Sequence, residues 1–205
     1  MKPSAYIGRF APSPTGPLHF GSLVCALASF LDARHHHGKW LVRIEDLDPP
    51  RALSGATTTI LKQLESHGLW WDGDLLYQSQ RDEAYRAALT QLQDDGLTYT
   101  CDCNRQRIAE LGGLYDGHCR QREVSSESAI RLRLPDRDSD SEITFDDLIM
   151  GPYRQNLNSD VGDFVIKRRD GLISYQLAVT VDDYFQRVSH IIRGADLLDS
   201  TPRQL

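Results

Sequence analysis

The chain has 205 residues, of which 40% are hydrophobic and 25% are charged, and its formal net charge at pH 7 is -6. This composition is typical of a soluble globular protein and argues against a broad basic surface that binds polyanions without specificity. No apolar run approaches the roughly 20 residues of a membrane span, and residues 1–10 lack the apolar core of a secretory signal. We therefore expect a cytoplasmic protein that does not bind membranes.

The first part of the chain predicts a strand, a helix and a second strand. Residues 5–10 (AYIGRF) and 39–46 (KWLVRIED) are short and apolar, and residues 22–38 between them have helical periodicity. We expect Ser22 to cap this helix at its N-terminus. The apolar side chains at helical spacing are expected to form its buried face: Leu23, Ala26, Leu27, Phe30 and Leu31.

Two further helices are predicted over residues 54–68 and 79–96, each beginning at a serine and ending at a glycine. Strands that alternate with such helices favour a parallel sheet. From about residue 99 the pattern changes to glycine-rich turns and a short alternating strand over 129–134. This change, with an acidic linker at 135–142, predicts an inserted α+β subdomain.

The last part of the chain is predicted to contain a hairpin and a returning strand. Residues 163–178 contain two apolar runs on either side of Asp170-Gly171, a pair that suits a tight reverse turn. Residues 187–198 offer another buried strand, which would return the chain to the first sheet.

The segment RFAPSPTGPLHFGS, residues 9–22, is rich in glycine and proline between the first strand and the first helix. Such a corner can be purely structural. Here it opens a helix, so unpaired N–H groups and the positive end of the helix dipole would face a ligand. Gly21 keeps side-chain bulk away and His19 offers a donor, so we expect a phosphate group to bind.

This segment resembles the first signature of the class I aminoacyl-tRNA synthetases in its glutamate-specific form. RIEDLD, residues 43–48, is similar to the acidic strand end of the same enzymes. HFGS stands where the class shows His-x-Gly-His, so Ser22 replaces the second histidine. GSLVCALASFLDAR, CDC with LYDGHCR, and SYQLAVTVDD are similar to a shortened branch of the family. The matching segments cover most of residues 7–199.

The resemblance implies an α/β fold in which a Rossmann-type parallel sheet binds nucleotide and carries an inserted zinc-bearing α+β subdomain. The catalytic domain would comprise residues 1–98 and 161–205, and the insertion residues 99–160. The class also has a lysine-bearing loop beyond the last strand, which would neutralise pyrophosphate. The sequence reaches TPRQL before such a loop, so we expect a fragment of a longer chain.

The resemblance further implies that ATP, accompanied by Mg²⁺, activates L-glutamate as glutamyl-adenylate. The acceptor in the shortened branch is queuosine in the anticodon of tRNA(Asp), and a monomer is expected. His19 and Gly21 would act in catalysis and, with Ser22, would bind ATP. The alternatives are a fragment of an ordinary glutamyl-tRNA synthetase charging tRNA(Glu), another nucleotidyltransferase, and an inactive binding module.

A glutamate pocket is also implied by the resemblance. Its residues would be Arg9, Ala11, Ser13, Glu45, Tyr175 and Arg193. The two arginines would hold carboxylates, because a guanidinium can pair with a carboxylate through two hydrogen bonds. Glu45 would hold the ammonium group, while Ser13 and Tyr175 would donate or accept hydrogen bonds. The nearby Asp46 and Asp48 are expected to be structural caps outside the pocket.

Three cysteines, Cys101, Cys103 and Cys119, lie close together in the sequence. In a cytosolic protein such a cluster favours a metal over a disulfide. Zinc prefers four ligands, so one is missing. His118 would be the usual fourth ligand, whereas the resemblance points to Tyr115. We expect one structural zinc on the three cysteines and Tyr115, with His118 as the alternative.

The inserted region is locally basic in an acidic chain. The arginines concerned are Arg105, Arg107, Arg120, Arg122, Arg131 and Arg133. They could meet tRNA phosphates. Since acidic residues lie among them, an exposed surface of mixed charge is an equal alternative.

Overall fold

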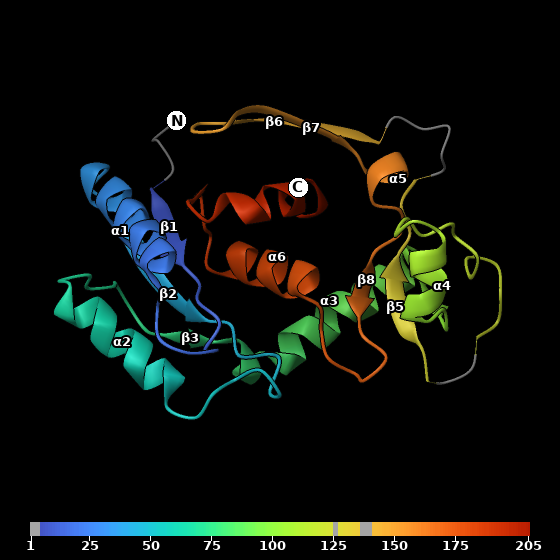
Figure 1. Cartoon of the computed structure of the whole chain (residues 1–205), viewed down its shortest axis with the longest axis horizontal. Helices are drawn as coiled ribbons and strands as arrows, with labels where there is room; N and C mark the ends of the chain where they lie inside the picture. Colours follow the sequence, from blue (N-terminus) through green and yellow to red (C-terminus); the bar gives the residue numbers. More distant parts are fainter. Residues whose placement is uncertain (1–4, 125–126, 136–140) are drawn as a thin grey trace. The chain divides into compact units, whose positions relative to one another are not determined.

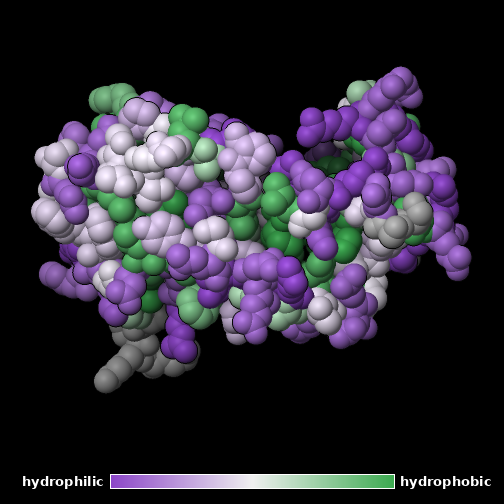
Figure 2. Space-filling view, turned by 90° about the horizontal axis from the view of Figure 1, so that it is seen from below, coloured by the Kyte–Doolittle hydropathy of each residue, from purple (hydrophilic) through white to green (hydrophobic). Residues whose placement is uncertain are grey.

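A computed structural model describes residues 5–124, 127–135 and 141–205 of the chain (Figure 1). Residues 136–140 of the predicted acidic linker lie outside the described residues. The chain forms two compact units, one of Met1–Asp82 with Asp182–Leu197 and the other of Glu83–Val181 with Leu198–Leu205. Hydrophilic side chains predominate on the face shown in Figure 2. Within the described ranges, no helix has the length and apolar character needed to cross a membrane.

The first unit contains a four-stranded sheet in the order β3-β2-β1-β9. The strands are β1 (Ile7–Phe10), β2 (Lys39–Ile44), β3 (Leu76–Tyr77) and β9 (His190–Ile191). All neighbouring pairs are parallel, which confirms the predicted parallel sheet and the return of the chain to it. The prediction that the returning strand is buried is wrong: β9 is exposed, because it lies at the edge of the sheet.

Two helices, α1 (Phe20–His35) and α2 (Ala56–Ser66), lie beside these strands in Figure 1. Both helices contribute to the core of this unit together with the strands. The Trp40 ring of β2 is fully buried there, and its Nε1–H donates to Ser29 Oγ of α1 at 2.8 Å. Burial of these apolar side chains holds the helices against the sheet.

The predicted start and buried face of α1 need correction. His19 rather than Ser22 is the N-cap, because the His19 ring accepts a hydrogen bond from the Ser22 N–H. The buried residues of the helix are Ala26, Ser29 and Ala33, whereas Leu27 and Leu31 are 47% and 54% exposed. Small residues allow close approach to the sheet, where a Cβ on Gly8 would lie 3.8 Å from Ala33 Cβ. The predicted face is therefore wrong for Leu27 and Leu31 only, since Ala26 is buried and Leu23 and Phe30 pack against the core.

The next two helices begin later than predicted. The N-cap of α2 is Gly55, with a φ of 77°, and not Ser54. α3 spans Asp82–Asp94, while Ser79 belongs to the short 3-10 helix η1 (Gln78–Gln80). Glycine is the residue that most readily adopts the left-handed backbone conformation found at position 55.

The second unit contains an antiparallel sheet and a separate hairpin. β4 (Thr98–Cys101), β5 (Ala129–Leu132) and β8 (Val165–Lys167) form the sheet in the order β4-β5-β8. The hairpin pairs β6 (Glu142–Asp147) with β7 (Gly151–Asn156). The helices α4 (Arg105–Glu110) and α5 (Leu157–Asp160) also belong to this unit.

The chain turns at Asp170-Gly171 as predicted, and Gly171 has a φ of 88°. The predicted hairpin is present in a short form: an antiparallel bridge joins Lys167 to Ile173 across the turn, and the Ser174 N–H donates to the Ile166 carbonyl at 3.0 Å. The chain then forms α6 (Tyr175–Phe185), which runs from the second unit into the first. A 3-10 helix, η2 (Ala195–Arg203), follows β9.

Candidate active site

The carboxyl ends of neighbouring parallel strands carry most of the predicted glutamate-binding residues. Arg9 is in β1, Glu45 directly follows β2, and Arg193 comes two residues after β9. Since β1 pairs with both β2 and β9, these residues belong to one edge of the sheet. Ligands of open α/β sheets bind at this edge.

The loop after β1 is tied to the end of β2, because the Glu45 N–H donates to the Pro12 carbonyl at 3.0 Å. Ala11 is half-buried and Ser13 is exposed. This bond keeps both predicted pocket residues in the same loop near the Glu45 backbone. Tyr175 belongs to the second unit, where it is the first residue of α6, and its part in the pocket stays a prediction.

Arg9 is only 3% exposed. Its Nε and Nη2 donate to the two carboxylate oxygens of Asp183, each at 3.3 Å. Nη1 of Arg9 takes part in neither of these bonds. One edge of the guanidinium is therefore held by the protein, and an N–H group remains for a ligand.

Glu45 lies beside Arg43, whose Nη2 donates to Glu45 Oε1 at 3.4 Å. The Glu45 side chain is 9% exposed. Burial raises the pKa of Glu45 above its ordinary value, although Arg43 and Arg9 act in the opposite direction. A bound ammonium group would favour the ionised carboxylate further, as the predicted role of Glu45 requires.

Asp46, which follows Glu45 in the sequence, binds Ser79. Its carboxylate accepts hydrogen bonds from the Ser79 N–H at 2.8 Å and the Ser79 hydroxyl at 2.7 Å. These bonds confirm Asp46 as a structural cap, here for η1.

His19 and Gly21 lie together at the N-terminus of α1. His19 Nδ1 accepts from the Ser22 N–H at 3.2 Å, so in the neutral ring the proton lies on Nε2, which can donate. A Cβ on Gly21 would lie 3.1 Å from His19 Cε1, which is tighter than an ordinary contact. Both residues are exposed and Ser22 is half-buried, so this end of α1 can meet an anion.

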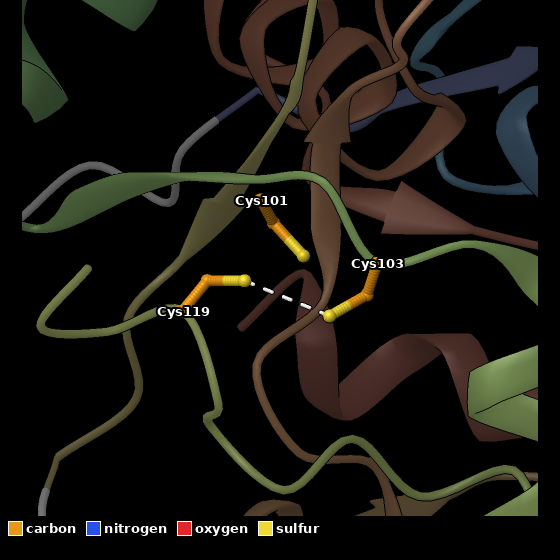
Figure 3. Close-up of side chains that lie close together, drawn as sticks. All are labelled: Cys101, Cys103 and Cys119. Atoms are coloured by element: carbon orange, nitrogen blue, oxygen red, sulfur yellow. Dashed lines mark hydrogen bonds between the residues drawn. The ribbon is translucent and has the colours of Figure 1, made fainter. Parts of the chain in front are cut away.

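The three clustered cysteines come together in the second unit (Figure 3). Their Sγ atoms all lie within 4.8 Å of one another, and those of Cys103 and Cys119 are 3.6 Å apart. Cys101 and Cys119 are buried, and Cys103 is half-buried. Three converging thiols at this spacing suit a soft or borderline metal ion such as zinc.

Tyr115 is buried against this cysteine cluster, whereas His118 is exposed. Tyr115 is 3% exposed, its hydroxyl is 3.5 Å from Cys101 Sγ, and it accepts from the Cys119 N–H at 2.8 Å. His118 is exposed. This geometry favours Tyr115 over His118 as the fourth ligand.

Sequence reasoning missed Arg131 as a neighbour of the cysteines. Its Nε donates to Cys101 Sγ at 3.2 Å, and its guanidinium lies over the Tyr115 ring at 3.8 Å. Burial raises the pKa of Cys101, but its hydrogen bonds with Tyr115 and Arg131 outweigh burial and lower that pKa. Pairing of β4 with β5 explains the contact, because Arg131 lies opposite Tyr99, two residues before Cys101.

Most arginines of the inserted region have partners within the protein. The ion pairs are Arg107–Asp116, Arg120–Asp163 and Arg122–Asp102, while Arg131 is buried and Arg133 donates to the Arg120 carbonyl. These contacts favour a surface of mixed charge over a dedicated phosphate-binding patch.

Comparison with known proteins assigns the chain to a family. Residues 7–205 match the sequence profile of the tRNA synthetases class I (E and Q), catalytic domain. The chain belongs to this family. Its members are ligases, and the Rossmann-type fold and the glutamate-specific resemblance of residues 9–22 and 43–48 agree with membership.

Within the family, the chain groups with the glutamyl-Q tRNA(Asp) synthetases. It is 56% identical to the "Glutamyl-Q tRNA(Asp) synthetase" of Pseudomonas fluorescens over 203 residues, 98% of this chain and 67% of the relative. A protein of the same name from Escherichia coli is 54% identical over 207 residues, 100% of this chain and 66% of the relative. The chain thus spans about two thirds of the length of these relatives.

Solved structures of glutamate-specific enzymes have the same fold. A glutamate tRNA ligase from Elizabethkingia meningosepticum has a TM-score of 0.85 and 28% identity, covering 98% of this chain and 46% of that one. The glutamate-tRNA synthetase from Elizabethkingia anophelis has a TM-score of 0.84 at 28% identity. Both confirm the class I α/β fold predicted from the sequence.

Proposed function

We propose that this protein uses ATP to activate L-glutamate as glutamyl-adenylate and transfers the glutamyl group to queuosine in the anticodon of tRNA(Asp). The observation that carries this proposal is the 54–56% identity, over nearly the whole chain, to relatives named glutamyl-Q tRNA(Asp) synthetase. The buried Arg9 and Glu45 at one sheet edge support it, since they offer the charges that a glutamate zwitterion needs.

In this proposal Arg9 pairs through its remaining N–H edge with a carboxylate of the substrate. Glu45 pairs with the substrate's ammonium group, and Arg193 holds the second carboxylate. Ser13 and Tyr175 supply hydrogen bonds, and the loop at Ala11 contacts the substrate. These contacts orient one carboxylate oxygen of the substrate toward ATP. Binding energy is thereby used to position this oxygen for reaction.

Activation forms a bond between that carboxylate oxygen and the α-phosphorus of ATP. The bond from the α-phosphorus to the bridging oxygen breaks, and pyrophosphate leaves with the electron pair. His19 Nε2–H and the backbone at Gly21 and Ser22 lie at the helix N-terminus, where they can stabilise phosphate charge. Mg²⁺ bound with ATP would neutralise further charge on the phosphates.

Transfer requires a hydroxyl of the queuosine ring to attack the carbonyl carbon of glutamyl-adenylate. An ester bond forms, the bond from that carbon to the adenylate oxygen breaks, and AMP leaves with the hydroxyl proton. We also propose that the protein acts as a monomer in the cytoplasm, where its tRNA would be found.

Labelled glutamate tests the acceptor. We expect the protein, given ATP, to attach label to queuosine-containing tRNA(Asp) within the anticodon stem-loop, as mapped by nuclease digestion. The same tRNA from cells that cannot make queuosine is expected to take no label. Label at the 3′-terminal adenosine of tRNA(Glu) would instead support the alternative, an ordinary glutamyl-tRNA synthetase activity. The observation in favour of this alternative is the structural similarity to a glutamate tRNA ligase.

We propose that Cys101, Cys103, Cys119 and Tyr115 hold one structural zinc ion. Converging thiols and an adjacent phenol support this site, and four protein ligands would leave no position for a substrate.

Changing Cys101 to serine is expected to remove the zinc, because a buried hydroxyl is a poorer zinc ligand than a thiolate. Metal analysis of the purified variant by mass spectrometry checks this, with one zinc per chain expected in the unchanged protein. The matched control is Cys25→Ser on α1, which should keep its zinc. Zinc retained at one per chain in Cys101→Ser would exclude Cys101 from the ligand set.

A further inference from the structure

We propose that Asp183 is the positioning residue of the glutamate pocket, holding Arg9 and Glu45 in place without touching the substrate. Asp183 lies in the last turn of α6. Besides the two bonds from Arg9, its carboxylate accepts from Arg43 Nη1 at 2.7 Å. This inference rests on the proposed roles of Arg9 and Glu45 in binding glutamate.

Asp183 determines the direction of the Arg9 guanidinium. A guanidinium is planar, so a carboxylate that binds the Nε and Nη2 edge fixes where Nη1 points. The side chains of Arg9 and Asp183 are 4% and 17% exposed, so solvent does little to weaken the pair. The N–H group left for a substrate carboxylate therefore depends on Asp183 for its orientation.

Asp183 reaches Glu45 through Arg43. Arg43 is fully buried, and its Nη1 is shared between Asp183 and Gln186 Oε1, the latter at 2.9 Å. Its Nη2 contacts Glu45 at 3.4 Å. Asp183 thus fixes the arginine that lies beside the carboxylate proposed to hold the ammonium group.

Loss of the Asp183 charge has two opposing effects on an incoming glutamate. Arg9 would become a stronger attraction for a carboxylate, because nothing would neutralise it. However, Glu45 already interacts electrostatically with both Arg9 and Arg43. Without the Asp183 charge, Glu45 would be the carboxylate that neutralises both arginines. The Glu45 carboxylate would then move toward the two arginines and away from the substrate's ammonium group. Arg9 would also lose the orientation that Asp183 gives it. We therefore infer that binding weakens.

The test is calorimetric titration of the whole chain with L-glutamate. Asp183→Asn is expected to weaken binding about tenfold or more, since misplaced binding groups are costly. Asp72→Asn is the matched control: Asp72 is another carboxylate of the first unit that accepts from an arginine, but that arginine is Arg34, at 2.6 Å. The control should change glutamate affinity by less than about twofold. Unchanged or tighter binding by Asp183→Asn would overturn the inference.

Two further measurements keep the inference separate from folding and from the proposed function. Asp183→Glu keeps the charge and moves the carboxylate by one methylene, so it should fold and still bind glutamate more weakly; normal affinity would contradict the positioning role. The Nε–H resonance of Arg9 by NMR should change in Asp183→Asn and persist in Asp72→Asn. If the unchanged protein binds no glutamate, the proposed function is wrong. If Asp183→Asn leaves the Arg9 resonance unchanged, the positioning role of Asp183 is wrong, whatever the outcome for glutamate.

Discussion

Replacing Arg9 by alanine is expected to weaken glutamate binding about a hundredfold or more, because a substrate carboxylate left without its buried cation costs roughly 3–5 kcal/mol. ATP binding should change little, since the proposed phosphate contacts are at His19 and the start of α1. Arg9→Lys should recover only part of the loss, because an ammonium group lacks the planar fork that Asp183 and a substrate carboxylate can share. Titration with each substrate separately measures both effects.

The control for this prediction is Arg34→Ala. Arg34 lies in the same unit and also pairs with a carboxylate, Asp72, at 2.6 Å, but both side chains are 35% exposed. Its removal should leave glutamate affinity unchanged. Equal losses of glutamate and ATP binding in Arg9→Ala would show that the substitution disturbs the whole site, and would contradict the specific role of Arg9.

Replacing Asp163 by asparagine is expected to lower the free energy of unfolding by roughly 3–5 kcal/mol, because the largely buried Arg120 loses its counter-charge. The Asp163 side chain is 1% exposed. Arg120 donates to it through Nε and Nη2, each at 2.6 Å, and Tyr99 and the Leu134 N–H donate as well. Asp163 thus connects β4, the segment after β5 and the turn that carries Cys119. Chemical denaturation at constant metal content measures the loss.

The stability due to Asp163 is also expected to depend on pH. Burial raises the pKa of Asp163, but the hydrogen bonds from Arg120, Tyr99 and Leu134 outweigh it and lower that pKa below its ordinary value. A carboxylate with a lowered folded pKa stabilises the protein above its unfolded pKa of about 4, and this stabilisation is lost as the pH falls through the folded pKa. The difference between the unchanged protein and Asp163→Asn should therefore be constant near neutral pH and shrink below about pH 4.

An exposed ion pair in the same unit provides the control. Glu142 and Arg154 lie 3.5 Å apart on the β6–β7 hairpin, with side chains 37% and 72% exposed. Glu142→Gln should cost less than about 1 kcal/mol, because solvent screens such pairs. A loss in Asp163→Asn as small as this would show that the buried Arg120–Asp163 pair contributes little to the stability of this unit.

The sequence by itself determined the elements whose signals are local. Apolar periodicity predicted β1, α1 and β2 in order, and the Asp170-Gly171 pair predicted the turn after β8. The motifs at 9–22 and 43–48 predicted the family, and the spacing of Cys101, Cys103 and Cys119 predicted the cluster. Each of these features depends on neighbours within a few turns of helix or one short motif, so composition and spacing suffice to find it.

Only the tertiary structure decided which side chains meet across the chain. Apolar periodicity predicted correctly that α1 buries Ala26 but wrongly that it buries Leu27 and Leu31. The close approach of the helix to β1 instead buries Ser29 and Ala33. Asp183 is 174 residues from Arg9 and 140 from Arg43, and no local pattern links them. Such contacts depend on strand order, on the end of α6 and on the space left in the core, which are settled only when all the elements pack together.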